Sequence, residues 1–295
     1  MSAFIWRSEV KISRRAATQV ILYTILALLL VGFFRSRLLW MGSLWWSDGL
    51  YSLSALVPFI SLAIVYTKRN QLRALSIRPS ALGLAVVLVT AAVTLAADFF
   101  NILHSLTPLL LVAMLAGLIL ALWGTVVLRE LLFPLGFLLL LVPVPPALLK
   151  RIDLPLQVLC ARAVEAVSRA VGMATQRVGS MLLFPGSDSI NVAPACNGVR
   201  SSLTMLMLSI LYVYFSRGRW YSRLAVVAAA VPFAYLANLV RLLGLVSGAH
   251  LLGQRFMNHE QAFDQVFGLL VFSGCVALLL LWARWVKCAS FMETF

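Results

Sequence analysis

Charge is scarce in this sequence: charged residues make up 12% of its 295 residues, against about 25% in soluble domains. Hydrophobic residues make up 62%, which excludes an ordinary soluble domain and indicates an integral membrane protein. The net charge of +14 would favour nucleic-acid binding in a soluble chain. Here Lys and Arg lie between apolar runs, where they serve orientation and headgroup contacts. We therefore expect contacts with membrane lipids and no nucleic-acid partner.

Cysteine and histidine are also few, with four and three residues. The cysteines show no CxxC spacing, so the sequence has no zinc or redox motif. We expect neither a metal nor an organic cofactor. The four cysteines are Cys160, Cys196, Cys275 and Cys288.

Long apolar runs are what the sequence has in abundance. A helix that crosses about 30 Å of hydrocarbon needs about 20 largely apolar residues, and about eight runs approach this length. The predicted fold is an all-α membrane bundle of about eight transmembrane helices, the first of them retained rather than cleaved as a signal peptide. The predicted spans are residues 17–34, 50–66, 82–97, 108–128, 131–149, 199–215, 224–246 and 265–286.

Positive charges predict the orientation, because Lys and Arg are retained on the cytoplasmic side of short connections. The basic start of the chain places both termini in the cytoplasm of a cell whose cytoplasmic (inner) membrane holds the protein. Connections 35–46, 98–106, 150–196 and 247–264 then fall on the outer, periplasmic side. Some basic residues on that side oppose the rule, and we expect them to snorkel from span ends. These are Arg35, Arg37, Lys150 and Arg151.

The predicted organisation has two parts. Residues 1–149 form an N-terminal bundle of five spans, in which Pro143, Pro145 and Pro146 kink or stop the fifth. Residues 150–295 form a catalytic membrane region of three spans preceded by a small outer cap. In that cap, the pattern over 156–178 predicts an amphipathic helix at the interface. Residues 180–193 predict two short strands about a turn at Pro185-Gly186.

The stretch 191–202 carries the main chemical signal, with Cys196 just before Gly198 and the start of an apolar helix. A helix N-terminus lowers the pKa of a thiol, and its backbone N–H groups can point at an attacked carbonyl. Cys196 is therefore a candidate nucleophile. It could instead be a small packing residue, or form a disulfide with Cys160 on the same oxidising side.

Two further polar clusters are predicted at the same outer level. Arg241 lies inside an apolar run, and Asn238 one turn earlier shares its helix face, so both should face the bundle interior and find a partner. Arg241 could otherwise be an anchor that snorkels to the interface. His259 and Asp264 lie just before the last span. A thiol, a guanidinium and an acid–base group together suit acyl transfer, in which Arg241 stabilises charge and His259 or Asp264 handles the proton.

At these residues the chain resembles the exosortase and archaeosortase family of multi-pass membrane transpeptidases. The family's Cys motif is similar to Ala195-Cys196-Asn197-Gly198, and its Asn-x-x-Arg motif is similar to Asn238-Leu239-Val240-Arg241. The resemblance is best over residues 150–286.

The chain departs from the family's third motif at one position. Bacterial members usually have His, three residues, then Gly at the start of the last span; Gly268 fits this frame, but Asp264 stands where His is expected. His259 is five residues too early. Either His259 reaches in from the preceding loop, or Asp264 pairs with Arg241 and orients it, or the activity has drifted.

The resemblance implies a thiol protease or transpeptidase that forms a thioester on Cys196. Its clients would be secreted proteins that end in a Pro-Glu-Pro-like motif, a transmembrane helix and a basic tail. Two other functions stay open: a small transporter component, in which Arg241 contacts the transported solute, and a non-catalytic scaffold of exopolysaccharide or sorting machinery. Loss of processing in a Cys196→Ser variant would separate the enzyme from both.

Overall fold

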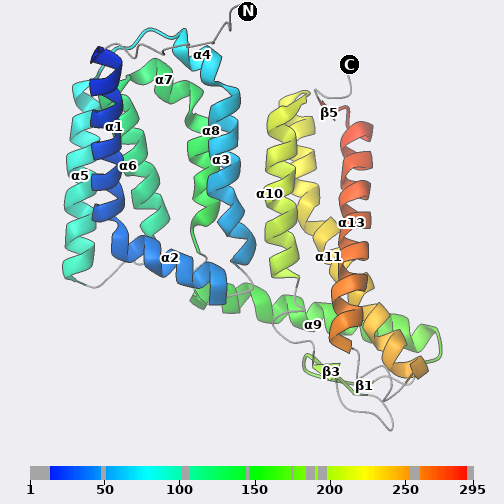
Figure 1. Ribbon diagram of the computed structural model, residues 1–295. Helices are drawn as coiled ribbons and strands as arrows, with labels where there is room; N and C mark the ends of the chain where they lie inside the picture. The colour runs from blue at the N-terminus through cyan, green and yellow to red at the C-terminus, as the bar shows by residue number, and fades with distance from the viewer. Residues whose placement is uncertain are drawn as a thin grey trace, which may run out of the picture.

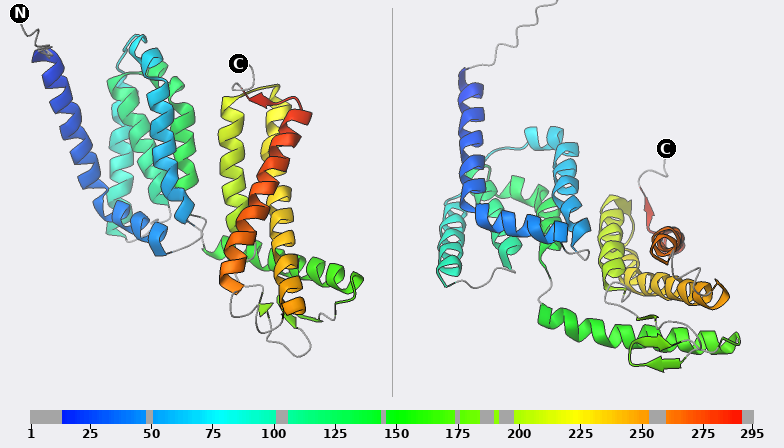
Figure 2. Two further views of the ribbon diagram at one scale, coloured as in Figure 1. Left: turned by 45° about the vertical axis from the view of Figure 1, so that its right-hand side comes forward. Right: turned by 60° about the horizontal axis from the view of Figure 1, so that its bottom comes forward.

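Helices make up most of the structure, a computed structural model of the chain (Figure 1). They gather into two groups, one from each half of the sequence, and the long helix α9 (Pro146–Ala170) runs across the end of the second group (Figures 1 and 2). The structure describes residues 14–47, 51–100, 106–143, 146–173, 176–183, 190–191, 198–252 and 260–290.

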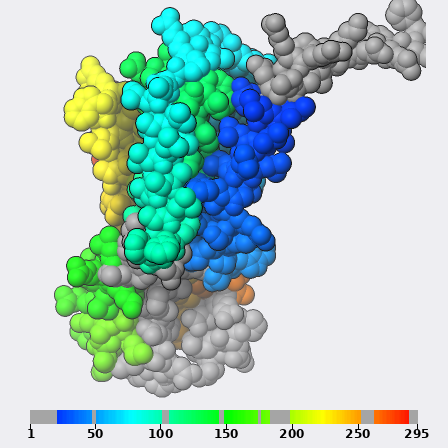
Figure 3. All heavy atoms as spheres, turned by 90° about the vertical axis from the view of Figure 1, so that its left-hand side faces the viewer, coloured from blue at the N-terminus to red at the C-terminus, as the bar shows by residue number. Residues whose placement is uncertain are grey.

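The first group combines long helices with short and broken ones. Its elements are α1 (Arg14–Phe33), α2 (Arg35–Ser47), η1 (Ser52–Ala55), α3 (Leu56–Thr67), α4 (Arg69–Arg73), α5 (Ala81–Phe99), α6 (Thr107–Leu122), α7 (Thr125–Glu130), α8 (Leu132–Phe137) and η3 (Leu138–Leu141). Helix α5 lies open on the face shown in Figure 3. The exposed side chains of α5 include the apolar Leu88, Val89 and Leu95, as a helix in contact with lipid requires.

The second group is a tight set of three helices. They are α10 (Val199–Phe215), α11 (Trp220–Leu252) and α13 (Glu260–Trp285). Strands β4 (Ser216–Arg217) and β5 (Ala289–Ser290) pair antiparallel at the end away from α9 (Figure 1). Small residues such as Ala230 and Ala234 are fully buried between these helices, and a helix interface rich in small residues lets the backbones approach closely.

Each predicted apolar run has a helix in the structure, but the helices differ in length. Three are long and apolar enough to cross a membrane: Ala81–Phe99, Trp220–Leu251 and Ala262–Trp285. Residues Ile21–Phe33 and Arg35–Ser47 would be a fourth if this pair, bent by 69°, is one span. The other apolar helices are shorter: Ser52–Thr67, Thr107–Leu122, Leu132–Leu141 and Val199–Phe215. The protein is thus a helical membrane protein, and a bundle of eight spans stays a prediction.

Two predicted span ends were wrong. The fourth run was expected to reach residue 128, but α6 ends at Leu122 because Gly124 follows in a left-handed conformation with φ +89°. A Cβ at Gly124 would collide with the carbonyl oxygen of Arg78. The fifth run was expected to reach residue 149, but η3 ends at Leu141, and a new helix begins at Pro146. Proline suits the first position of a helix, where no N–H is needed.

In the region of the predicted cap, the structure contains a helix and short strands whose bounds differ from the predicted ones. The amphipathic helix was expected over 156–178, whereas α9 covers 146–170 and stops before Gly172, which has φ +80°. Three short antiparallel strands follow in the order β1-β2-β3: β1 (Gln176–Val178), β2 (Met181–Leu183) and β3 (Ile190–Asn191). Strands β2 and β3 correspond to the two predicted strands, and β1 was not predicted. The predicted turn at Pro185-Gly186 lies outside the described residues.

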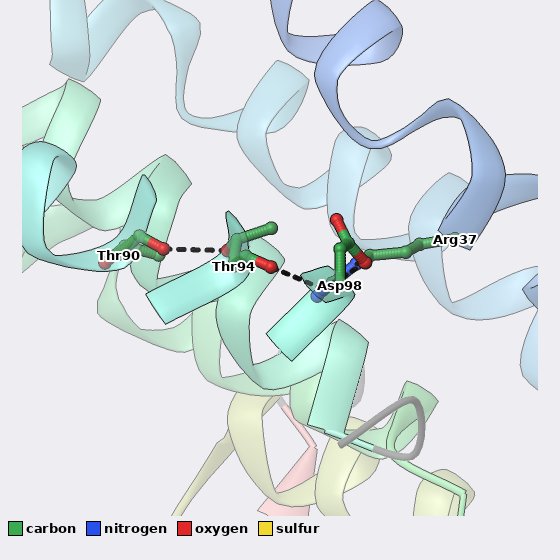
Figure 4. A network of polar contacts seen from close by, with 4 residues as sticks. All are labelled: Arg37, Thr90, Thr94 and Asp98. Atoms are coloured by element: carbon green, nitrogen blue, oxygen red, sulfur yellow. Dashed lines mark hydrogen bonds and ion pairs between the residues drawn. The ribbon is translucent and has the colours of Figure 1, made fainter. Parts of the chain in front are cut away.

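The expectation that Arg37 snorkels was also wrong. Arg37 is 2% exposed and donates from Nε and Nη2 to Oδ1 of Asp98, over 3.0 and 2.6 Å. Its Nη2 also donates to the backbone oxygen of Thr94 over 2.8 Å. Figure 4 shows this network, in which Thr94 in turn donates to the backbone oxygen of Thr90. A buried guanidinium needs such partners, and α5 provides them for α2.

Candidate active site

The second group directs one end of each of its three helices toward the side where α9 lies. There α10 begins, α11 approaches its end and α13 begins (Figure 1). Gly198 precedes α10 in the left-handed conformation with φ +78°, which glycine adopts without the strain of a Cβ. Cys196 and Asn197, the two residues before it, lie outside the described residues, as does His259.

Arg241 and Asp264 form a two-pronged ion pair between α11 and α13. Arg241 Nε donates to Asp264 Oδ1 over 2.6 Å, and Arg241 Nη2 donates to Asp264 Oδ2. Both side chains are 23% exposed. Parallel N–H···O bonds between a guanidinium and a carboxylate fix the guanidinium plane as well as its position. The structure therefore shows Asp264 paired with Arg241, and the catalytic roles of Asp264 and His259 stay predictions.

Asn238 connects this ion pair to α9 and to the start of α10. It lies one turn before Arg241 on α11 and is 2% exposed. Its Nδ2 donates to Cys160 Sγ on α9 over 3.6 Å. A Cβ built on Gly198 would lie 3.4 Å from Asn238 Cβ, so the Asn238 side chain packs directly on the turn that starts α10.

Gly268 leaves space for the Arg241 side chain. A Cβ at Gly268 would lie 3.2 Å from Arg241 Nε and 3.3 Å from its Cδ. This is closer than most real contacts of a Cβ, so a larger residue would push the guanidinium away from its present place. The glycine predicted as a supporting residue thus touches the predicted arginine.

These residues line one open groove of about 420 Å³ between α10, α11, α13 and η1. Its lining is part polar and part apolar. The residues are Leu53, Arg200, Ser201, Thr204, Ala237, Asn238, Arg241, Asp264, Gln265, Gly268, Leu269 and Phe272. The structure brings together Asn238, Arg241, Asp264 and Gly268 in this lining, and Gly198 beside it.

Two residues near the groove were missed by sequence reasoning. Arg200 lines the groove from the first turn of α10; its position directly after the Cys196 motif could have drawn attention to it. Cys160 is fully buried against α11, and its thiol forms no disulfide. Burial raises the pKa of the Cys160 thiol, although the hydrogen bond from Asn238 acts in the opposite direction. Cys160 was considered only as a disulfide partner, and here it is a hydrogen-bond partner of Asn238.

The described residues contain no group of three or more His, Cys, Asp and Glu side chains placed to hold a metal ion. Among the described residues, the polar groups that line the groove are guanidinium, carboxylate, amide and hydroxyl groups. His250 is exposed near the end of α11.

Comparison with known proteins adds one match. A sequence model of the family described as Transmembrane exosortase (Exosortase_EpsH) matches residues 45–281, well over half of the chain. No curated protein and no solved structure matches the chain significantly. The matched range covers α9, the three helices of the second group except the last residues of α13, and every residue that lines the groove. The chain therefore belongs to the transmembrane exosortase family.

Proposed function

We propose that the protein is a cysteine transpeptidase that cleaves the C-terminal sorting signals of secreted proteins at the outer face of the cytoplasmic membrane. Cys196 is the nucleophile, Arg241 stabilises charge, and Asp264 orients Arg241. Asn238 and Gly268 support Arg241, and Asn197 and Gly198, the two residues that follow Cys196 in the sequence, support the nucleophile. Membership of the family supports the processing of sorting signals, and the roles of these residues are our assignment.

The observation that carries the proposal is the Arg241–Asp264 pair on the wall of an open groove. Its neighbour Asn238 packs on Gly198, two residues after Cys196. An arginine held at Nε and Nη2 by one carboxylate keeps a fixed direction, and a preorganised donor stabilises developing charge without reorganising during the reaction. A fixed cation beside a thiol also favours the thiolate over the thiol.

The proposed reaction has two steps, formation of a thioester and its resolution. The thiolate of Cys196 attacks the carbonyl carbon of the scissile peptide, a C–S bond forms, the C–N bond breaks, and the departing amine takes up the proton that the thiol gave up. An acceptor amine or a water molecule then attacks the thioester, which releases the thiol. Asp264 and His259 are the two acid–base candidates for carrying the proton.

A non-catalytic scaffold is the second candidate function. The observation that favours it is the same ion pair, because Asp264 stands where bacterial relatives would carry a histidine and neutralises Arg241 directly. In a scaffold, this pair would only hold α11 against α13. Cys196 would then have no chemical task.

The test uses full-length protein and a secreted reporter from the same genome that ends in a short motif, an apolar span and an Arg-rich tail. Wild-type protein is expected to shorten the reporter, whereas Cys196→Ser and Cys196→Ala leave it uncut. Cys275→Ser is the matched control, since Cys275 is buried in α13 with other apolar residues. Normal shortening by Cys196→Ser would overturn the transpeptidase in favour of the scaffold or a transporter component.

A further inference from the structure

Three charged side chains line the groove among the residues that the structure describes: Arg200, Arg241 and Asp264. The two-pronged pair of Arg241 with Asp264 balances one positive charge with one negative charge. Arg200 has no carboxylate within ion-pair distance in the described part of the chain. The groove therefore carries one positive charge that its own described residues leave unbalanced.

The position of Arg200 suits contact with a ligand rather than with the interior of the protein. Arg200 is exposed, and its Nη2 donates to Ser52 Oγ over 3.3 Å. This bond is long and its acceptor is neutral, so it costs little to exchange for a charged acceptor. Because Ser52 belongs to η1 and Arg200 to α10, the guanidinium lies where the two helix groups meet at the groove.

The residues that line the groove with Arg200 indicate which groups a bound ligand would contact. Leu53 and Thr204 line the groove and also a smaller hollow beside it. That hollow is otherwise mostly apolar, with Leu140, Val142 and Met207 in its wall. The groove that Arg200 lines also contains Asp264 and Arg241. A segment bound in the groove and the hollow would thus contact apolar side chains, the Arg200 guanidinium and the Arg241–Asp264 pair.

We infer that Arg200 is a specificity-determining residue that binds a carboxylate side chain of the substrate segment beside an apolar neighbour. Asp264 keeps Arg241 from competing for that carboxylate, so the two arginines divide their tasks: Arg200 binds the acidic side chain, and Arg241 serves the reacting carbonyl. A guanidinium and a carboxylate match each other through two parallel hydrogen bonds, which lysine cannot provide. This inference rests on the proposed function, because it assigns a binding task within the same groove.

The experiment measures binding without turnover, on full-length Cys196→Ala protein in detergent. The probes are two fluorescent blocked peptides, acetyl-Val-Pro-Glu-Pro-Ala-amide and its Gln counterpart. The Glu peptide is expected to bind about tenfold more tightly than the Gln peptide, as a charge-assisted hydrogen bond allows. Arg200→Gln should remove this preference, and Arg200→Lys should keep only part of it. Arg162→Gln, which removes an exposed arginine from α9, is the control and should keep the full preference.

A charge exchange makes the test sharper. Arg200→Glu should reverse the preference, so that a peptide with Lys in place of Glu binds more tightly than the Glu peptide. Equal binding of the Glu and Gln peptides, or a preference that survives Arg200→Gln, would overturn the role of Arg200. If the wild-type protein fails to cut any reporter while the preference depends on Arg200, the proposed function fails and the carboxylate site stands. If cutting occurs and the preference is absent, the role of Arg200 alone fails.

Discussion

Arg241 enters the groove from a long apolar helix, and its charge is met by a carboxylate from the neighbouring helix. A guanidinium within a membrane-spanning segment is costly unless it faces a partner or water. The 23% exposure of both side chains shows that the pair stands at the edge of the groove rather than sealed inside the bundle. At the residue scale, Asp264 thus decides where the guanidinium of Arg241 points.

This arrangement predicts the effect of Asp264→Asn. An amide cannot accept two hydrogen bonds and balance the charge, so Arg241 loses its fixed direction. Processing of the reporter should fall by about a hundredfold or more, the size of effect seen when an oxyanion donor is lost. His259→Ala should leave processing nearly intact, and rates of reporter cleavage measure both. The reverse pattern would assign the third catalytic role to His259 instead.

At the scale of elements, helix contacts depend on where glycine lets backbones approach. Gly83 at the start of α5 lies against the backbone of Ala121 on α6, and a Cβ there would collide with it. Gly124 follows the end of α6, and its positive φ allows the chain to turn beside Arg78. These two glycines let α5 and α6 pack closely at this end of the pair.

The contact predicts that Gly83→Ala destabilises the protein. The clash is with backbone and not with a side chain that can rotate, so α5 and α6 must move apart, at a cost of about 1–3 kcal/mol. The thermal unfolding midpoint of the purified protein in detergent should fall. Gly32→Ala is the matched control, since nothing lies within 4 Å of a Cβ at that position of α1. Equal midpoints for the two variants would mean that α5 and α6 are not this close.

At the scale of the whole molecule, side chains from several elements join the two helix groups. At the end away from α9, Phe133 of α8 stacks on Tyr214 of α10, with ring centroids 3.6 Å apart. Nearer the groove, Met207 of α10 packs with Val57 of the first group. At the groove itself, Arg200 reaches Ser52. Since one wall of the groove comes from η1, the first group helps to shape the site as well as to anchor it.

The stacked pair gives a test of this junction. Phe133→Ala removes a ring from between the groups and should lower the thermal unfolding midpoint, by an amount that corresponds to about 1–3 kcal/mol for a ring that is only partly buried. Phe59→Ala on α3 should change the midpoint little, because Phe59 is 70% exposed. A similar shift in both variants would show that the stack does not join the two groups.

The sequence by itself determined that the protein lies in a membrane, where its apolar runs begin and end to within several residues, and that Arg241 needs a partner. These features are local: hydropathy, glycine and proline act on their own stretch of chain. Even so, the ends set by Gly124 and by the prolines after Leu141 came earlier than hydropathy suggested.

Only the tertiary structure decided which side chains meet. Asp264 pairs with Arg241 across two helices, Asp98 binds Arg37 from 61 residues away, and Ser52 meets Arg200 from 148 residues away. Each pair depends on helix rotation and packing, which the spacing of residues along one helix does not determine. The snorkelling expected of Arg37 failed for this reason, because a carboxylate on another helix offered the guanidinium a better partner than the interface.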